Sequence, residues 1–163
     1  MTPKYKVISE ICDGDIVVLH WTVENSIGLK CSLNGFHSVV VLARQIDAYP
    51  GPFTLSNIED DFRAVSLGVD WVYDFDPMSL EFRHTTRPPL GSLVITGDGP
   101  AVVSHNQNGR HFVSSAGTLA ERTDADPVTT NWRILIKDAN GKAQEFFRWP
   151  IPQRDEVARD TDE

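Results

Sequence analysis

Alternating apolar and polar residues predict β-strands along most of the chain. From Ile27 to Leu33 every odd-numbered residue is apolar, which places one face of this segment toward a core. Asn34-Gly35 separates it from the apolar segment Phe36–Ala43. Both turn residues tolerate positive φ angles, so the dipeptide predicts a two-residue hairpin. That register places Leu29 opposite Val40, with one face of the pair buried and the other half-exposed.

A second turn dipeptide, Asp13-Gly14, separates the strand-like segments Tyr5–Cys12 and Asp15–Val23. Glu24–Ser26 supplies a third turn. The first 45 or so residues therefore predict a four-stranded antiparallel meander. Within it, Ile16–Trp21 is apolar on both faces and is expected to lie centrally.

One short helix is expected after the prolines of Tyr49–Phe53, which break regular structure. Ser56 and Glu59 have the spacing of a capping box, with Ser at the N-cap and Glu three residues later. The pattern predicts a helix over Asn57–Val65. Its apolar stripe consists of Ile58, Phe62 and Val65.

The second half of the chain returns to strand patterns. The expected segments are Val69–Phe75, Ser79–Thr85, Leu93–Thr96, Ala101–His105, Arg110–Ser115, Trp132–Asp138 and Lys142–Trp149. The sequence thus predicts an all-β fold with minor helix, an antiparallel sandwich or barrel of about ten strands. We expect one β-rich domain over residues 1–152 and a charged tail over residues 153–163.

Composition and charge limit the partners. The net charge of −8 argues against nucleic acid and anionic membranes, which both attract basic surfaces. The apolar runs are far shorter than the roughly 20 residues of a membrane-spanning helix. The amino-terminal residues have no apolar core of a secretory signal, so we expect a cytoplasmic protein or part of a particle assembled inside the cell.

Two cysteines, Cys12 and Cys31, bear on the compartment. The predicted meander separates them by about 13 Å along the neighbouring strand, too far for a disulfide. We therefore expect two free thiols and a reducing compartment. Neither cysteine has a neighbouring His or a Cys-x-x-Cys partner to support a nucleophilic or metal role, and we expect no cofactor.

The tripeptide His-x-Thr occurs twice, as His20-Trp21-Thr22 and as His84-Thr85-Thr86. This pair resembles the 2H phosphoesterase family. The resemblance implies that His20 and His84 act as general acid and base and that Thr22 and Thr86 bind phosphate. The second tripeptide departs from the family pattern, because Thr85 stands where an apolar residue is usual. The family also alternates strands with long helices, which this sequence does not predict.

Two other groups of residues are candidates for binding. His105 and His111 flank a turn and would face each other across a three-residue loop, close enough to share a metal ion, although no third ligand is evident. The alternative is an ordinary polar hairpin tip. Acidic residues gather in the middle of the chain and could face a basic protein, or simply be solvated. They are Glu59, Asp60, Asp61, Asp70, Asp74 and Asp76.

Four functions fit these observations. We expect a non-enzymatic structural or protein-interaction module, a possible homo-oligomer and a subunit of a larger complex such as a phage or virus particle. The tail would then contact another subunit. The alternatives are an acidic inhibitor of immunity type, a 2H-type phosphoesterase, and a β-barrel that binds a small molecule, either as a binding protein or as an enzyme. The barrel cavity would be bounded by Trp71, Tyr73, Phe82 and His84.

Overall fold

The computed structural model describes residues 3–21, 24–44, 52–82, 86–138 and 140–150. Within them the chain forms strands and two short 3₁₀ turns, η1 (Ile8–Glu10) and η2 (Pro77–Ser79), but no α-helix. The strands are β1 (Lys4–Val7), β2 (Ile16–His20), β3 (Asn25–Leu33), β4 (Phe36–Arg44), β5 (Phe53–Leu55), β6 (Arg63–Gly68), β7 (Trp71–Asp74), β8 (Leu93–Thr96), β9 (Gly99–Asn106), β10 (Gly109–Ser114), β11 (Val128–Thr129), β12 (Trp132–Lys137) and β13 (Ala143–Trp149).

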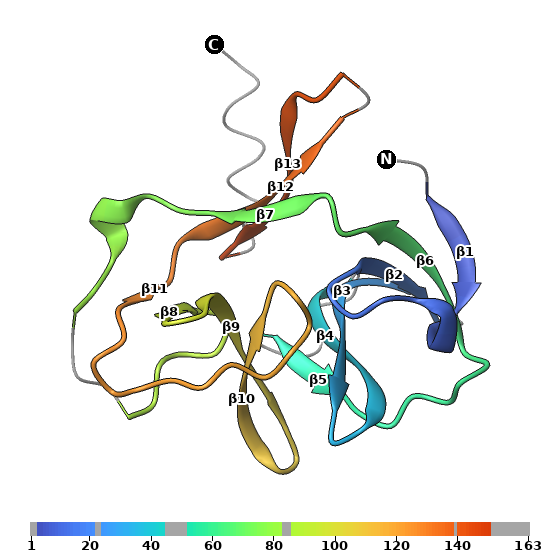
Figure 1. Ribbon diagram of the computed structural model, residues 1–163, viewed down its shortest axis with the longest axis horizontal. Helices are drawn as coiled ribbons and strands as arrows, with labels where there is room; N and C mark the ends of the chain where they lie inside the picture. The colour runs from blue at the N-terminus through green and yellow to red at the C-terminus, as the bar shows by residue number, and fades with distance from the viewer. Residues whose placement is uncertain (1–2, 22–23, 45–51, 83–85, 139, 151–163) are drawn as a thin grey trace.

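These strands form two sheets, which confirms the all-β prediction. Ten strands make one strongly curved sheet in the order β1-β6-β2-β3-β4-β5-β9-β8-β11, with β10 paired to β9. The other sheet has the order β13-β12-β7 and lies above the larger one in Figure 1. The large sheet does not close on itself, so the fold is sandwich-like and is not a closed barrel. The described residues include no helix long and apolar enough to cross a membrane.

The main core lies between the two sheets. Trp71, Trp132 and Phe147 of the small sheet pack on residues of β2, β3, β4, β8, β9 and β10. Trp132 stands at the centre, 1% exposed, and its ring centroid lies 5.4 Å from that of Tyr73 and 5.6 Å from that of Phe147. These rings join the small sheet to the large one.

Local hairpin signals predicted the centre of the large sheet correctly. Asn34 (φ 52°) and Gly35 (φ 81°) form the expected two-residue turn, and Leu29 pairs with Val40. A β-bulge near Ile27 shifts the last pairs of this hairpin by one residue. β2 lies between β6 and β3, as its two apolar faces indicated.

The prediction of a hairpin at Asp13-Gly14 is wrong, because β1 pairs with β6 and not with β2. The turn η1 carries the chain out of the β1 direction. Asp13–Asp15 then folds over β3: the amide of Gly14 donates to the carbonyl of Lys30, and the amide of Lys30 donates to that of Asp15, both at 2.9 Å.

The predicted helix over residues 57–65 is also wrong. Asn57 has a φ of 59°, which is incompatible with a right-handed helix, and β6 begins at Arg63. The amide of Ile58 donates to the carbonyl of His37, and the carbonyl of Phe62 accepts from the amide of Ile8. These long-range hydrogen bonds satisfy backbone groups that a helix would have paired internally. The capping-box spacing is therefore present without a helix to cap.

This loop covers the second face of the central strands, which was expected to be half-exposed. Ile58 and Phe62 pack with residues of η1, β2 and β4 in a second apolar cluster. The face even buries Lys30, which is 1% exposed. Its Nζ donates to Asp13 at 2.7 Å and to the carbonyl of Cys31 at 3.0 Å. An ion pair and a hydrogen bond thus compensate for burial of the ammonium group.

The sequence predicted a strand over residues 79–85, but the described part of this segment, residues 79–82, does not form a strand. The side chain of Asp76 accepts from the amide of Met78, which starts η2. Glu81 makes only a single bridge with Val128, and Phe82 is 75% exposed. Phe82 therefore does not line a cavity with Trp71 and Tyr73, which belong to the core. Residues 83–85 and the tail 151–163 lie outside the described residues.

The two cysteines are free thiols, as predicted. Burial raises the pKa of the Cys31 thiol to about 12, whereas Cys12 is exposed. We expect a thiol reagent to label Cys12 in the folded protein and Cys31 only after unfolding. The unfolded Cys31 loses its proton near pH 9.0 and the folded one does not. Above pH 9.0 the folded protein therefore keeps a proton on Cys31 that the unfolded chain loses. The contribution of Cys31 to the free energy of unfolding falls as pH rises through this range.

Equal, rapid labelling of both cysteines in the native protein, followed by mass spectrometry, would contradict the burial of Cys31. A Cys12→Ser variant is the control. It should show no fast-reacting thiol, while its unfolding midpoint stays close to that of the parent because residue 12 is exposed.

Candidate functional site

An open groove of about 740 Å³ lies where β5 meets β9. Phe53, the first residue of β5, pairs in parallel with His105 near the end of β9, so β5 continues beside the turn that follows β9. The turn after β9, with Asn106, Gln107 and Asn108, therefore lies next to Ser56. The complete lining of described residues is Trp21, Arg44, Phe53, Thr54, Leu55, Ser56, His105, Asn106, Gln107 and Asn108.

Aromatic rings form part of the groove wall. The ring centroid of Trp21 lies 5.3 Å from that of Phe62, and its Nε1 donates to Ser26 at 3.1 Å. The guanidinium of Arg44 lies 5.8 Å from the centre of the Phe53 ring. These contacts hold the two aromatic side chains in place before any ligand arrives, which lowers the entropic cost of binding.

The side chains of Arg44 and His105 in the groove have polar partners within the protein. Arg44 forms an ion pair with Glu24, whose side chain is 2% exposed. A ring nitrogen of His105 lies 3.1 Å from the carbonyl oxygen of Pro52. The groove therefore presents apolar surface with little net charge.

Side-chain amides form the opposite rim. Asn106 Nδ2 donates to Ser56 at 3.2 Å, and Asn106 Oδ1 accepts from the amide of Asn108 at 2.8 Å. Gln107 and Asn108 are exposed at the tip of the β9–β10 hairpin, which reaches downward in Figure 1. Amides offer both donors and acceptors to a ligand.

The four residues of the phosphoesterase resemblance are only partly described. His20 is exposed, and its Nδ1 lies 2.7 Å from Asn25 Oδ1. Thr86 is exposed as well. Thr22 and His84 lie outside the described residues, so the pairing of His20 with His84 stays a prediction.

The two histidines of the β9–β10 hairpin do not face each other. Gly109 pairs with Asn106, so the loop has two residues and not the three that were expected. His105 is opposite Arg110 and His111 is opposite Ser104. Because neighbouring residues alternate between faces, the two histidines lie on opposite faces of the hairpin. Among the described residues, no group of three or more His, Cys, Asp or Glu side chains could hold a metal ion.

The six acidic residues divide into two groups. Glu59, Asp60 and Asp61 lie in the loop before β6, where Asp60 Oδ1 is 3.5 Å from His37 Nε2. Asp70, Asp74 and Asp76 lie in or beside β7 in the small sheet. The first group thus lies beside a strand of the large sheet and the second in the small sheet.

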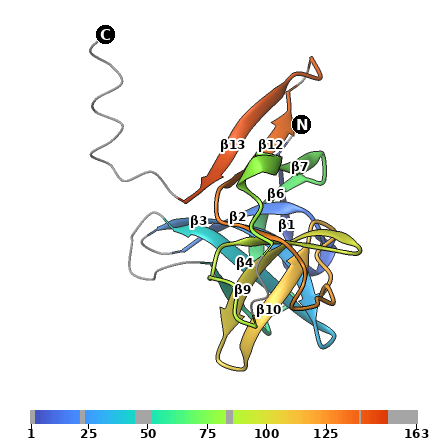
Figure 2. The ribbon, with the colours of Figure 1, turned by 90° about the vertical axis from the view of Figure 1, so that its left-hand side faces the viewer.

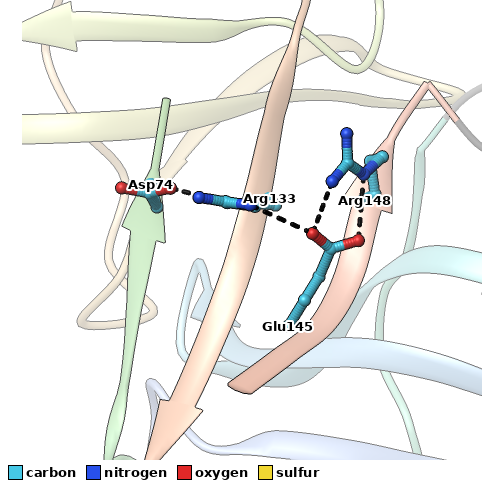
Figure 3. A network of polar contacts seen from close by, with 4 residues as sticks. All are labelled: Asp74, Arg133, Glu145 and Arg148. Carbon is cyan, nitrogen blue, oxygen red and sulfur yellow. Dashed lines mark hydrogen bonds and ion pairs between the residues drawn. The ribbon is translucent and has the colours of Figure 1, made fainter. Parts of the chain in front are cut away.

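Asp74 belongs to a network on the small sheet (Figure 3). Arg133 Nε donates to Asp74 at 2.6 Å, and Arg133 Nη1 donates to Glu145 at 3.3 Å. Glu145 also accepts two hydrogen bonds from Arg148, at 2.6 and 2.9 Å. The hydrogen bonds from Arg148 are the main reason that the pKa of Glu145 is lowered from its ordinary value. The carboxylate therefore stays charged at neutral pH.

Sequence reasoning missed the groove. Its wall comes from Trp21, Phe53 and the turn 106–108, which are distant in sequence. A parallel pair such as β5 and β9 has no local turn signal to reveal it. The only available hint was the position of Trp21 and Phe53 beside predicted breaks.

Comparison with protein-family models, curated proteins and solved structures finds no match to this chain.

Proposed function

We propose that this chain is a non-enzymatic interaction module whose groove binds an extended segment of another protein in a larger complex. The observation that carries this proposal is the groove itself, with its fixed aromatic wall and amide rim. An apolar side chain of the partner would lie against Trp21 and Phe53. The partner's peptide groups would pair with the amides of Gln107 and Asn108.

The chemistry of the groove supports binding. Its ionisable side chains in the described lining are Arg44 and His105. Arg44 is paired with Glu24 and keeps its proton in proteins. His105 is oriented toward the Pro52 carbonyl. Recognition of a ligand needs fixed donors, acceptors and rings such as these.

A small molecule is the second candidate ligand. The volume of about 740 Å³ falls in the range of roughly 300–1,000 Å³ that is usual for small-molecule pockets. A flat ring could lie on Trp21 while its polar substituents meet the amides. The groove is open, however, and this favours an extended chain over an enclosed small ligand.

Site-specific photo-crosslinking tests the proposal. A photoreactive residue replaces Asn108 at the groove, or Phe36 as a control at the far end of β4, and each protein is irradiated in its source cells. We expect Asn108 to capture one defined peptide of another protein and Phe36, which is 56% exposed, to capture none of it. The captured protein identifies the complex, and a phage or virus particle is the expectation.

Two outcomes contradict the protein-segment proposal. In the first, Asn108 and Phe36 capture the same set of proteins. In the second, Asn108 captures no protein while native mass spectrometry of the purified chain shows a bound small molecule that is lost in a Trp21→Ala variant. The second outcome favours the alternative ligand.

A further inference from the structure

His105 lines the groove and has one ring nitrogen available to a ligand. The residue lies near the end of β9, in the hairpin that points away from the small sheet (Figure 2). Its Nδ1 lies 3.1 Å from the carbonyl oxygen of Pro52. Its Nε2 makes no hydrogen bond within the described part of the chain and is not among the buried side-chain atoms that lack a partner there. A ligand in the groove can therefore reach Nε2.

The contact with Pro52 fixes the position of the ring proton. A carbonyl oxygen only accepts hydrogen bonds, so the proton in this bond belongs to Nδ1. A neutral imidazole has one N–H and one acceptor nitrogen, and the bond made by one nitrogen sets the role of the other. The neutral ring of His105 therefore presents Nε2 to the groove as an acceptor.

Building on the proposed function, we propose that His105 Nε2 accepts a backbone N–H of the bound protein segment. The apolar residue of the segment that lies against Phe53 also passes His105, because these two residues pair across β5 and β9. The N–H that Nε2 accepts belongs to this apolar residue or to one of its neighbours in the segment. Proline has no N–H, so it does not fit at that position.

This acceptor makes the groove selective among extended segments. The side-chain amides of Gln107 and Asn108 contain both donors and acceptors, so they can pair with either an N–H or a C=O of the partner. Nε2 of the neutral His105 ring can only accept. A segment that covers Nε2 without offering a donor leaves it desolvated and unpaired, which weakens binding of that segment relative to one with an N–H there.

Two substitutions of His105 separate the roles of its two ring nitrogens. The amide of His105→Asn lies near the place of Nδ1 and keeps a donor for Pro52, but it offers no acceptor at the place of Nε2. The longer His105→Gln side chain brings its amide near the place of Nε2 and keeps an acceptor there. A purely structural role in holding Pro52 would make the glutamine variant the weaker one.

Calorimetry with the crosslinked segment, made as a synthetic peptide, compares these variants. We expect binding about three- to tenfold weaker in His105→Asn than in wild type, the loss of one hydrogen bond. Binding to His105→Gln should be closer to wild type. His111→Asn is the matched control, because His111 lies on the opposite face of the same hairpin and should not affect binding.

Methylation of the peptide's backbone nitrogens, one at a time, locates the donated N–H. One methylated position should weaken binding to wild type about three- to tenfold and should have no further effect on His105→Asn. Nitrogen NMR of the free chain checks the tautomer without any partner. We expect the ring proton of His105 on Nδ1, and the spectrum of His105→Asn assigns its signals.

The outcomes distinguish this contact from the groove itself. The contact is overturned if Trp21→Ala weakens binding while His105→Asn binds like wild type and no methylated position depends on His105. It is also overturned if His105→Gln binds more weakly than His105→Asn, or if the ring proton lies on Nε2. If the peptide binds Trp21→Ala as tightly as wild type, the proposed function fails and the contact fails with it.

Discussion

Replacing Trp132 with alanine is expected to lower the free energy of unfolding by about 3–5 kcal/mol. The indole is 1% exposed and contacts rings of both neighbouring strands, Tyr73 on β7 and Phe147 on β13. Its Nε1 also donates to the carbonyl of Gly91 at 2.6 Å. Truncation therefore leaves a large cavity between the two sheets and an unpaired buried carbonyl.

Urea unfolding of Trp132→Ala and Trp132→Phe separates these contributions. The phenylalanine variant keeps most of the apolar volume and loses the hydrogen bond, so it should be clearly less destabilised than the alanine variant. Phe36→Ala, at an exposed site, should stay within about 0.5 kcal/mol of wild type. A loss below about 1 kcal/mol for Trp132→Ala would mean that this side chain does not join the sheets.

The second large effect is expected at Gly117, which has a φ of +73°. A Cβ at this position would lie 2.4 Å from both the Gly14 nitrogen and the Lys30 oxygen, which are backbone atoms. Neither can move without breaking the contact of the Asp13–Asp15 loop with β3. Gly117→Ala should therefore cost about 4 kcal/mol or more, in the range of severe single substitutions.

Gly35→Ala provides a matched control for backbone strain. Gly35 has a φ of +81°, but a Cβ there would meet nothing within 4 Å. It should therefore cost only the left-handed strain of about 1–2 kcal/mol. The comparison of the two unfolding curves isolates the steric effect. Equal losses for both variants would show that Gly117 is not in close contact with β3.

The sequence predicted those parts of the fold whose partners are close in the chain. Asn34-Gly35 fixed the β3–β4 hairpin because its backbone conformation matches the twist of the flanking strands. The segments Trp132–Asp138 and Lys142–Trp149 were also expected as strands, and they form the neighbouring strands β12 and β13. In these cases the local conformational preference and the tertiary contacts agree.

The errors occur where distant contacts override a local preference. Residues 57–65 have a helical cap pattern, but Ile58 and Phe62 are needed to cover Val39 and Val41 from a loop. Likewise, β1 precedes the turn dipeptide Asp13-Gly14 yet pairs with β6, more than fifty residues away. Such pairing depends on which apolar faces remain uncovered after the central hairpins form, and no local pattern records this.

The candidate site was less predictable than the fold. Residues such as His105 and the acidic residues near β7 could be chosen as candidates from their side-chain chemistry. Which side chains lie next to them depends on the register of strand pairing. One residue less in the β9–β10 loop places His105 and His111 on opposite faces. The groove depends on the parallel pairing of Phe53 with His105, which joins two segments from different parts of the chain.

The affinity of the crosslinked partner segment for purified chain variants tests the proposed groove most directly. The measurement compares wild type with Trp21→Ala, Gln107→Ala and the exposed-site control Phe36→Ala, by calorimetry at one salt concentration. We predict that the two groove variants weaken binding at least tenfold, or about 1.4 kcal/mol, while Phe36→Ala binds like wild type. Wild-type affinity in both folded groove variants would contradict the proposal that this groove is the binding site.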